Sequence, residues 1–257
     1  MTKNNIDVYI DFKSPYAYIA IDPTRKFAKK LNLKINWLPY VLEIPDFLGS
    51  AQVDNTGKIL ESKRNDHQWR RVKYSYMDCR RYANLRNITV LGPQKIWNTN
   101  LVSISLLWIK EMEPELGDFF IDFIYLNFWK RNLDIENIEV IENVFKKIGA
   151  KSSGFKDWKE KEGINRLQNT MDYAHKNGVF GVPSYFILDE LYWGREQLPL
   201  IQARITGNYD KVILSHCAIS NIVFPAFYIF FYGNCPTIFH IFIKIFKEKS
   251  IFCLHRQ

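Results

Sequence analysis

The chain has 257 residues, of which 47% are apolar and 16% aromatic, and its formal charge is +8. This length and composition allow one large domain or two small ones with a buried core. The basic residues are scattered apart from a cluster between Lys63 and Arg86, with no arginine-rich arm and no zinc-finger spacing. We therefore expect a basic surface helix there and no nucleic-acid partner.

The positions of the cysteines limit the redox chemistry that the protein can perform. None of the four cysteines, at positions 79, 217, 235 and 253, stands in a C-x-x-C pair. A dithiol redox site and a structural zinc are therefore not expected, and we predict no metal. Free thiols are typical of a reducing compartment, and the polar N-terminus shows no signal-peptide pattern, so the sequence predicts a cytoplasmic location.

The first 40 residues predict a β-α-β unit. Residues 6–12 alternate in polarity and are rich in β-forming side chains, which predicts a strand. Residues 15–31 show the spacing of an amphipathic helix, and residues 34–40 read as a second strand with Pro39 near its end.

Ser14 stands between the first strand and the first helix, directly before Pro15. A hydroxyl at that place lies at the mouth of a helix, where unpaired N–H groups and the macrodipole favour negative charge. Two interpretations stay open. Ser14 is a plain N-cap with proline at the first helical position, or its hydroxyl holds a bound thiolate or carboxylate.

The middle of the chain reads as mostly helical. Residues 41–57 carry several Gly, Pro and Asn breakers and predict a loop. Amphipathic or apolar helical patterns follow, with a loop at 88–93, over these ranges: 66–86, 98–112, 116–131, 136–148 and 161–177. Gly149 and Gly178 are C-cap candidates just beyond two of these helices.

The pattern then returns to strands. Residues 182–188 and 191–193 predict a hairpin with a turn at Asp189-Glu190. Residues 196–206 predict a closing helix, interrupted early by Pro199.

This order of elements predicts an α/β protein with a thioredoxin-like fold and a large all-helical insertion. We expect residues 1–44 and 178–207 to form a discontinuous thioredoxin-like domain. Residues 45–177 are then the helical insertion domain.

Residues 208–257 form an atypical hydrophobic tail. The stretch from Val212 to Ile243 has no Asp, Glu, Lys or Arg, but Pro225, Gly233 and Pro236 interrupt it. Three interpretations stay open: a membrane anchor, a helical hairpin packed on the domain, or translation outside the ancestral reading frame. Membrane contact is expected only where the tail is a real part of the protein.

Three groups of residues together resemble one family. They are residues 11–18 (DFKSPYAY), then Lys73, Asp78 and Arg81 with 97–99 (WNT), and finally 178–184 (GVFGVPS) with 191–198 (LYWGREQL). These stretches resemble the 2-hydroxychromene-2-carboxylate isomerase family, which is related to kappa-class glutathione transferases and to DsbA-type thioredoxin-fold proteins. The resemblance covers about residues 5–207.

The resemblance implies glutathione as the cofactor. It places Ser14 where redox members of the fold have their first cysteine, and a serine cannot form a disulfide. The hydroxyl would donate to the glutathione sulfur and favour the thiolate, since a hydrogen bond to the charged form lowers a thiol pKa. Ser14 is thus the predicted catalytic residue, as an activator of the sulfur rather than as the nucleophile.

The resemblance also implies the rest of the glutathione site. Val182-Pro183 is predicted to be a cis peptide bond, with the backbone of Val182 pairing with the cysteinyl backbone of glutathione. The γ-glutamyl end would be held at Trp193, Gly194, Arg195 and Glu196, with Glu196 receiving the ammonium group. The alternative for Glu196 is that it only complements the helix dipole.

Two residues are candidates for substrate contact. Asn98 would reach a substrate carboxylate or phenolate, or it is a plain N-cap of the helix at 98–112. Tyr16, with Tyr18 and the insertion helices, would form an aromatic wall for a small aromatic or conjugated substrate. The loop at 43–50 departs from the family, which often has Lys and Asn there for glutathione, and Asn55 is a candidate replacement.

The leading hypothesis is a glutathione-dependent isomerase, involved in aromatic compound catabolism. Glutathione conjugation of the kappa-class kind is the related alternative, and a stable thioether product would favour it. A non-catalytic thioredoxin-like binding module is the third hypothesis, and its function would survive Ser14→Ala. Relatives also suggest a homodimer.

Overall fold

The computed structural model describes residues 4–209. The chain divides into two compact units, one ending at Leu198 and one beginning at Pro199, and of the second only residues 199–209 are described. The expected separation of residues 1–44 and 178–207 from an insertion at 45–177 stays a prediction. The three interpretations of the tail concern residues that, from 210 on, lie outside the described part.

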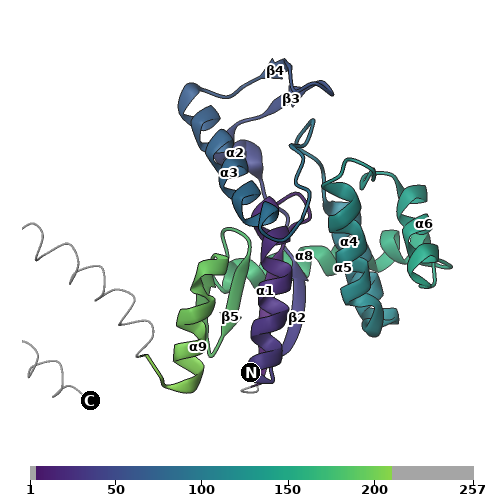
Figure 1. The fold of residues 1–257 in the computed structure, drawn as a ribbon. Helices are drawn as coiled ribbons and strands as arrows, with labels where there is room; N and C mark the ends of the chain where they lie inside the picture. The colour runs from purple at the N-terminus through teal and green to yellow at the C-terminus, as the bar shows by residue number, and fades with distance from the viewer. Residues whose placement is uncertain (1–3, 210–257) are drawn as a thin grey trace, which may run out of the picture. The chain divides into compact units, whose positions relative to one another are not determined.

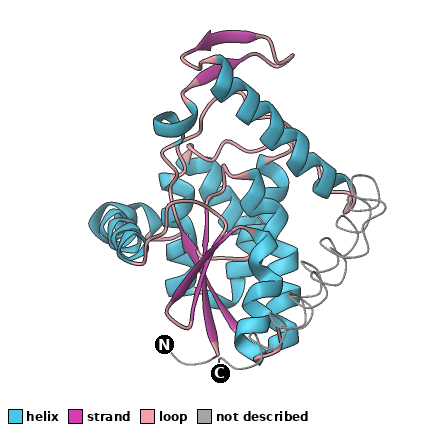
Figure 2. Ribbon diagram, turned by 90° about the vertical axis from the view of Figure 1, so that its left-hand side faces the viewer, coloured by secondary structure: helices cyan, strands magenta, loops and turns pink. Residues whose placement is uncertain are grey.

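A four-stranded mixed sheet lies at the centre of the first unit (Figure 2). Its order is β2-β1-β5-β6, with these bounds: β1 Asn5–Ile10, β2 Lys34–Pro39, β5 Ser184–Ile187 and β6 Glu190–Trp193. β1 runs parallel to β2 and antiparallel to β5. Five of the six residues of β1 are buried, as expected for a strand covered on both faces. The predicted thioredoxin-like fold is confirmed.

Helix α1 (Pro15–Leu31) has the predicted bounds because both ends carry strong local signals. Ser14 is the N-cap, and its Oγ accepts a hydrogen bond from the backbone N–H of Ala17 at 3.2 Å. Pro15 follows at the first helical position. Asn32 ends the helix in the left-handed conformation with φ 54°.

Proline 23 lies inside α1, where it removes one backbone donor. The carbonyl of Ile19, four residues earlier, therefore lacks its usual N–H partner. The Arg86 guanidinium replaces it, because Nη2 donates to the Ile19 oxygen at 2.7 Å. Arg86, which lies far along the chain, thus supplies the hydrogen bond that Pro23 removes from α1.

The segment between β2 and β5 is mainly helical, as predicted (Figure 1). Its longer helices are α3 Asp66–Asn84, α4 Asn100–Met112, α5 Gly117–Phe128, α6 Ile138–Ile148 and α8 Ile164–Lys176. Shorter pieces are α2 Ile44–Leu48, η1 Pro114–Leu116, α7 Phe155–Trp158 and the π-turn η2 Lys159–Gly163. Gly149 and Gly178 have positive φ at the predicted helix ends.

The insertion is not all-helical, and the prediction of a loop over residues 41–57 was wrong. The segment contains α2 and the strand β3 (Ala51–Val53), which pairs with β4 (Ile59–Ser62) in a separate hairpin. Pro45 begins α2 instead of breaking it, since proline fits the first turn of a helix. All of β4 is exposed, so it has no buried face to give it the alternating pattern of a strand.

Several predicted boundaries shift for local reasons. The helix expected from residue 161 begins at Ile164, after the π-turn, and Gly163 is needed there because a Cβ would lie 2.7 Å from Ile104 Cγ2. The β5–β6 turn is Leu188-Asp189, both at positive φ, so Glu190 already belongs to β6.

The closing helix begins as a 3-10 turn, η3 Arg195–Gln197, and continues as α9 Leu198–Thr206. Pro199 falls in the first turn of α9 and does not interrupt it. Within residues 4–209 we find no helix with the length and apolarity needed to cross a bilayer.

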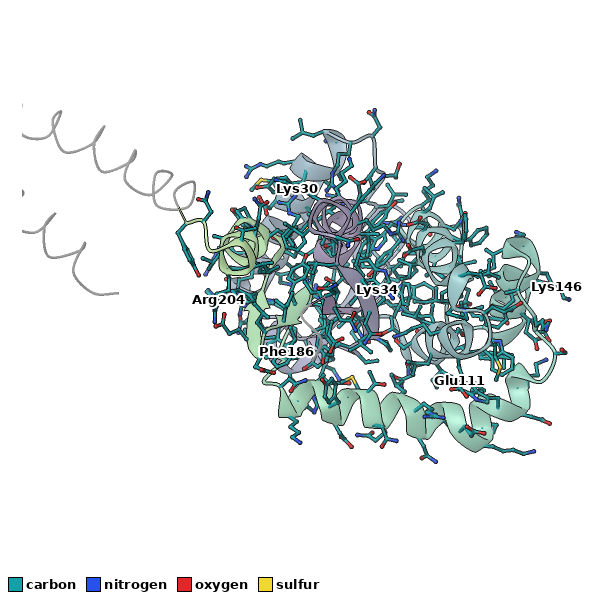
Figure 3. The ribbon with its side chains drawn as sticks, turned by 90° about the horizontal axis from the view of Figure 1, so that it is seen from below. Lys30, Lys34, Glu111, Lys146, Phe186 and Arg204 are labelled. Carbon is teal, nitrogen blue, oxygen red and sulfur yellow. The ribbon has the colours of Figure 1, made fainter. Side chains whose placement is uncertain are left out.

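Aromatic side chains dominate the core. The largest fully buried ones include Trp129, Tyr9, Tyr125, Tyr185, Phe12 and Phe120. Buried hydroxyls find partners, as between Thr24 Oγ1 and Tyr185 Oη at 2.9 Å. The view from below labels Lys30, near the end of α1, and Lys34, at the start of β2 (Figure 3).

Candidate functional site

The candidate site lies at one edge of the sheet, where β1 and β2 both end. Ile10 pairs with Pro39, so the turn with Ser14 and the loop from Tyr40 leave the sheet side by side. Tyr9 pairs with Ser184, which brings the preceding residue Pro183 to the same edge. The Val182-Pro183 bond is cis, as predicted. Ligands of open α/β sheets bind at such carboxyl ends of strands.

Ser14 is 6% exposed, and its Oγ accepts one hydrogen bond, from Ala17 N. A hydroxyl also has one hydrogen to donate. Within residues 4–209 no acceptor takes that hydrogen. At the N-terminus of a 17-residue helix, the hydroxyl is therefore free to donate to an anion.

A buried ion pair holds the turn that carries Ser14. The carboxylate of Asp11 is fully buried and accepts from the backbone N–H of Leu42 at 2.8 Å. Lys13 Nζ lies 3.4 Å from Asp11 Oδ2 and donates to Thr99 Oγ1 at 3.2 Å. The turn is thus tied to the loop after β2 and to the start of α4. Sequence reasoning missed this pair, although the acid and the base stand two positions apart just before Ser14.

The two tyrosines of the predicted aromatic wall are engaged with the helices of the insertion. Tyr16 Oη donates to Asp78 Oδ2 on α3 at 3.3 Å, and burial raises the Tyr16 pKa. Tyr18 stacks on Tyr125 with ring centroids 5.0 Å apart and planes 3° apart. Burial raises the Tyr18 pKa to about 12. These contacts anchor α1, which leaves less ring surface for a ligand.

Asn98 is not the N-cap of the helix at 98–112. Helix α4 starts at Asn100 with Thr99 as N-cap, but without a cap bond from the Thr99 side chain. Asn98 Oδ1 instead accepts from Asn100 N at 2.8 Å, and its own N–H donates to Glu136 Oε1 at 2.7 Å. The short Asx-type turn explains why the sequence suggested a cap one residue early.

A cavity of about 1260 Å³ opens beside this edge of the sheet. Its lining includes Tyr40, Leu42, Asn98, Leu101, Leu167 and Phe180. Ser14 is not in the lining, but its turn contacts the cavity wall through the bond of Asp11 to Leu42 N. The volume is above the usual range of ligand pockets, and the lining does not include Val182 or Glu196.

The loop before β5 offers free backbone groups. Pro183 O accepts from Gly194 N at 2.9 Å, and Ser184 Oγ donates to Gly181 O at 2.7 Å. Val182 is 6% exposed, yet within the described residues its own N–H and C=O have no hydrogen-bond partner. Buried backbone groups are nearly always paired, so this residue is suited to pair with a peptide-like ligand.

Arg195 and Glu196 lie in η3, next to this loop. The Arg195 guanidinium is stacked on Tyr82 of α3, with its Cζ 3.8 Å from the ring centroid. Glu196 is exposed, and its carboxylate folds back over Gly194, where a Cβ would collide with it. Gly194 has φ 101°, so the backbone favours glycine there.

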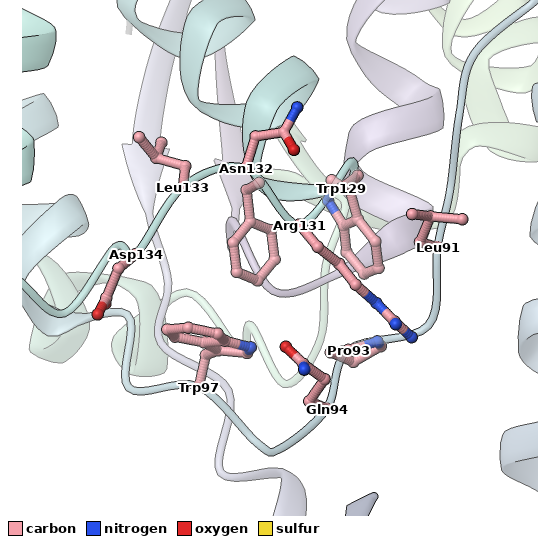
Figure 4. Close-up of a pocket in the computed structure, with 10 residues that line it drawn as sticks. Leu91, Pro93, Gln94, Trp97, Trp129, Arg131, Asn132, Leu133 and Asp134 are labelled. Carbon is pink, nitrogen blue, oxygen red and sulfur yellow. The ribbon is translucent and has the colours of Figure 1, made fainter. Parts of the chain in front are cut away.

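Two other residues discussed from the sequence, Cys79 and Asn55, are not placed to take part in the chemistry of this site. Cys79 is fully buried, and burial raises its pKa to about 12, so it carries no thiolate. The carbonyl of Asn55 accepts from Arg131 Nη1 at 3.3 Å. Arg131 and Trp97 line a second cavity, of about 310 Å³ (Figure 4). In the described part of the chain, His, Cys, Asp and Glu side chains form no group that could hold a metal ion.

Known proteins support the fold and the resemblance. A 2-hydroxychromene-2-carboxylate isomerase from Pseudomonas sp. (strain C18) is 23% identical over 206 residues, which cover 79% of this chain and 90% of the relative. The isomerase of the same name from Pseudomonas putida is 24% identical over 204 residues, or 77% of this chain and 92% of the relative. A solved structure of a 2-hydroxychromene-2-carboxylate isomerase gives a TM-score of 0.61 at 19% identity, covering 84% of this chain and 98% of that one. The DSBA-like thioredoxin domain family matches residues 5–206, so the chain belongs to that family.

Proposed function

We propose that this protein is a glutathione-dependent isomerase of the 2-hydroxychromene-2-carboxylate type. The observation that carries the proposal is the Ser14 hydroxyl, which has a free hydrogen at the N-terminus of α1 and lies at the same end of the sheet as the cis-proline loop. The names of the curated relatives support the same reaction type. A cytoplasmic location belongs to the proposal, because glutathione is kept reduced in the cytosol.

Glutathione would bind along the edge of the sheet. Its cysteinyl backbone pairs with the unpaired N–H and C=O of Val182, as an added strand pairs with a sheet edge. Its γ-glutamyl ammonium meets the exposed carboxylate of Glu196, beside Trp193 and Gly194. Arg195 is stacked on Tyr82 and contributes to positioning of η3.

In this placement the glutathione sulfur would lie next to Ser14. The Ser14 O–H donates to the sulfur, and the partial positive charge of the α1 N-terminus adds to the effect. Both interactions favour the thiolate over the thiol, so the pKa of the bound thiol falls. Oγ keeps accepting from Ala17 N, which holds the hydroxyl in place.

The reaction leaves glutathione unchanged. Bound glutathione would supply a thiolate that adds reversibly to the open-chain form of the substrate, whose carbonyl is conjugated. That form arises when the cyclic hemiketal breaks its ring C–O bond and passes the hydroxyl proton to the phenolic oxygen. Addition would turn the substrate's double bond into a single bond that can rotate, and expulsion of the thiolate would restore the double bond and release glutathione. The Asn98 amide has its Nδ2 hydrogens available for the oxygen that carries the charge, since Oδ1 is used by Asn100 N.

Calorimetric titration with glutathione tests the binding half of the proposal. We expect heat of binding for the wild type and weaker binding for Glu196→Ala, because the ammonium loses its partner. Assay with 2-hydroxychromene-2-carboxylate and catalytic amounts of glutathione tests the chemical half. Absence of glutathione binding in the wild type would overturn the proposal in favour of a binding module.

A kappa-class-like glutathione transferase is the second candidate, because Ser14 at the start of α1 would activate a thiolate for conjugation as well. Both reactions use the same activated thiolate. Product analysis separates them: a stable thioether identifies the transferase, and recovery of free glutathione identifies the isomerase.

A further inference from the structure

Phe180 presents an exposed aromatic ring beside the cis-proline loop. The residue is 61% exposed and belongs to the lining of the large cavity, together with Leu42 and Asn98. Only Gly181 separates it from Val182. Because the ring is exposed and lines the cavity, it is available to a ligand bound there.

Trp193 fixes the position of this ring. The two ring centroids lie 5.0 Å apart with an interplanar angle of 55°, and Trp193 is itself 53% exposed. The indole reaches this place only because residue 181 is glycine, where a Cβ would lie 2.7 Å from Trp193 Nε1. The pair is therefore a preorganised aromatic surface rather than a loose side chain.

The rings expected from the sequence are poorly placed for this role. The Tyr16 hydroxyl is bonded to Asp78, and Tyr18 is stacked on Tyr125. Phe180 has neither kind of contact with the helices of the insertion. Phe47 of α2, 42% exposed, is the other phenylalanine in the cavity lining and is therefore the alternative candidate for a stacking surface.

We propose that Phe180, backed by Trp193, is the surface on which the flat conjugated substrate stacks, and that it sets the specificity for planar substrates. The proposal rests on the proposed function, because cysteinyl pairing at Val182 brings the sulfur next to this ring. Offset or edge-to-face contacts between a ring and a planar conjugated system are favourable beyond the area they bury. Phe180 transfers no proton and forms no bond in the reaction, so it acts on substrate affinity rather than on the chemical step.

The test uses the full chain with 2-hydroxychromene-2-carboxylate and glutathione. We expect Phe180→Ala to raise KM about fivefold with little change in kcat, as removal of one aromatic contact predicts. Phe180→Tyr keeps the ring and should restore KM. Phe119→Ala is the matched control, since Phe119 on α5 is 64% exposed but is not part of the cavity lining.

Two calorimetric measurements complete the test. Glutathione affinity should be the same in Phe180→Ala as in the wild type. Binding of 2-hydroxychromene-2-carboxylate in the presence of S-methylglutathione should weaken about fivefold in the variant. Because this measurement needs no turnover, it tests the role of Phe180 in substrate binding separately from the proposed catalytic activity.

Three outcomes would overturn the stacking role of Phe180. One is an unchanged KM and an unchanged substrate affinity in Phe180→Ala. Another is an equal loss of glutathione affinity, which would make Phe180 part of the cofactor site. The third is a larger rise in KM for Phe47→Ala, which would assign the surface to α2.

Discussion

Ser14 combines a structural and a chemical role in one hydroxyl group. Its Oγ caps α1 through Ala17 N, and its hydrogen is free for a ligand. Replacement by alanine removes both roles at once, so loss of activity alone would not separate them. A residue that caps well but cannot donate to a thiolate does separate them.

We predict different outcomes for two variants of Ser14. Ser14→Ala should lose about 1 kcal/mol of unfolding free energy along with the activity, because the cap is gone. Ser14→Asp should keep the wild-type stability, since aspartate is an equally good N-cap, but lose activity because its charge repels a thiolate. Urea unfolding and glutathione-dependent turnover measure the two effects. Activity in Ser14→Asp would contradict the role of the hydroxyl.

Beside Ser14, the site contains the buried ion pair between Asp11 and Lys13. Their side chains are 0% and 7% exposed, so neither charge is well solvated. Removing one partner of such a pair leaves the other buried without compensation, which typically costs about 3–5 kcal/mol.

We predict that Asp11→Ala destabilises the protein by an amount in that range, and that Asp11→Ala with Lys13→Met is less destabilised than the sum of the single variants. The reason is that the double variant no longer buries a lone ammonium group. Urea unfolding of the four proteins gives the coupling energy. Additive effects would show that the ion pair contributes nothing to stability.

At the scale of elements, α1 depends on a residue outside itself. Pro23 removes a donor from the helix, and Arg86 supplies one to Ile19 O from the chain that follows α3. The repair also ties α1 to the insertion, so the helix that carries Ser14 is held from its middle as well as from its cap.

We predict that the loss of unfolding free energy caused by Arg86→Met depends on residue 23. With Pro23 present the loss should be about 1–3 kcal/mol, because a buried carbonyl is left without a donor. In the Pro23→Ala background it should be much smaller, because the new backbone N–H satisfies Ile19 O. Unfolding in urea measures both. Equal costs in the two backgrounds would mean that the bond to Ile19 is incidental.

At the scale of the whole molecule, buried phenols determine how the protein responds to alkali. Burial raises the pKa of Tyr9 and of Tyr18 to about 12, and it raises those of Tyr16, Tyr76 and Tyr185 as well. Phenols ionise near pH 10 in the unfolded chain. The folded state therefore holds more protons than the unfolded state above that pH, and stability falls as the pH rises.

We predict a loss of unfolding free energy between pH 10 and 12, where the unfolded phenols ionise and the folded ones do not. Between pH 8 and 10.5 Lys110 makes the unfolding free energy rise with pH, because burial lowers its pKa in the folded protein to about 8 from 10.5. In Lys110→Met, any rise of the unfolding free energy below pH 10 should therefore be smaller, and the fall above pH 10 should remain. Urea unfolding against pH, with phenol absorbance, measures this. Tyrosines that ionise near pH 10 in the folded protein would contradict the prediction.

Much of the architecture follows from local signals. The bounds of α1 follow from Ser14, Pro15 and the apolar spacing. The G-V-F-G-V-P stretch suggested the cis bond at Pro183. The β3–β4 hairpin was missed because its strands are short and largely exposed, so burial imposes no pattern on them.

The sequence by itself determined the thioredoxin-like order of elements, the helical middle and the position of Ser14 at a helix start, because caps, prolines and periodicity act within a few residues. Only the tertiary structure decided which partners meet across long stretches of chain: Lys13 with Thr99, Arg86 with Ile19, and Phe180 with the large cavity. Such contacts depend on how packed elements cross in space, and a residue carries no local mark of a partner that lies 60 or more positions away.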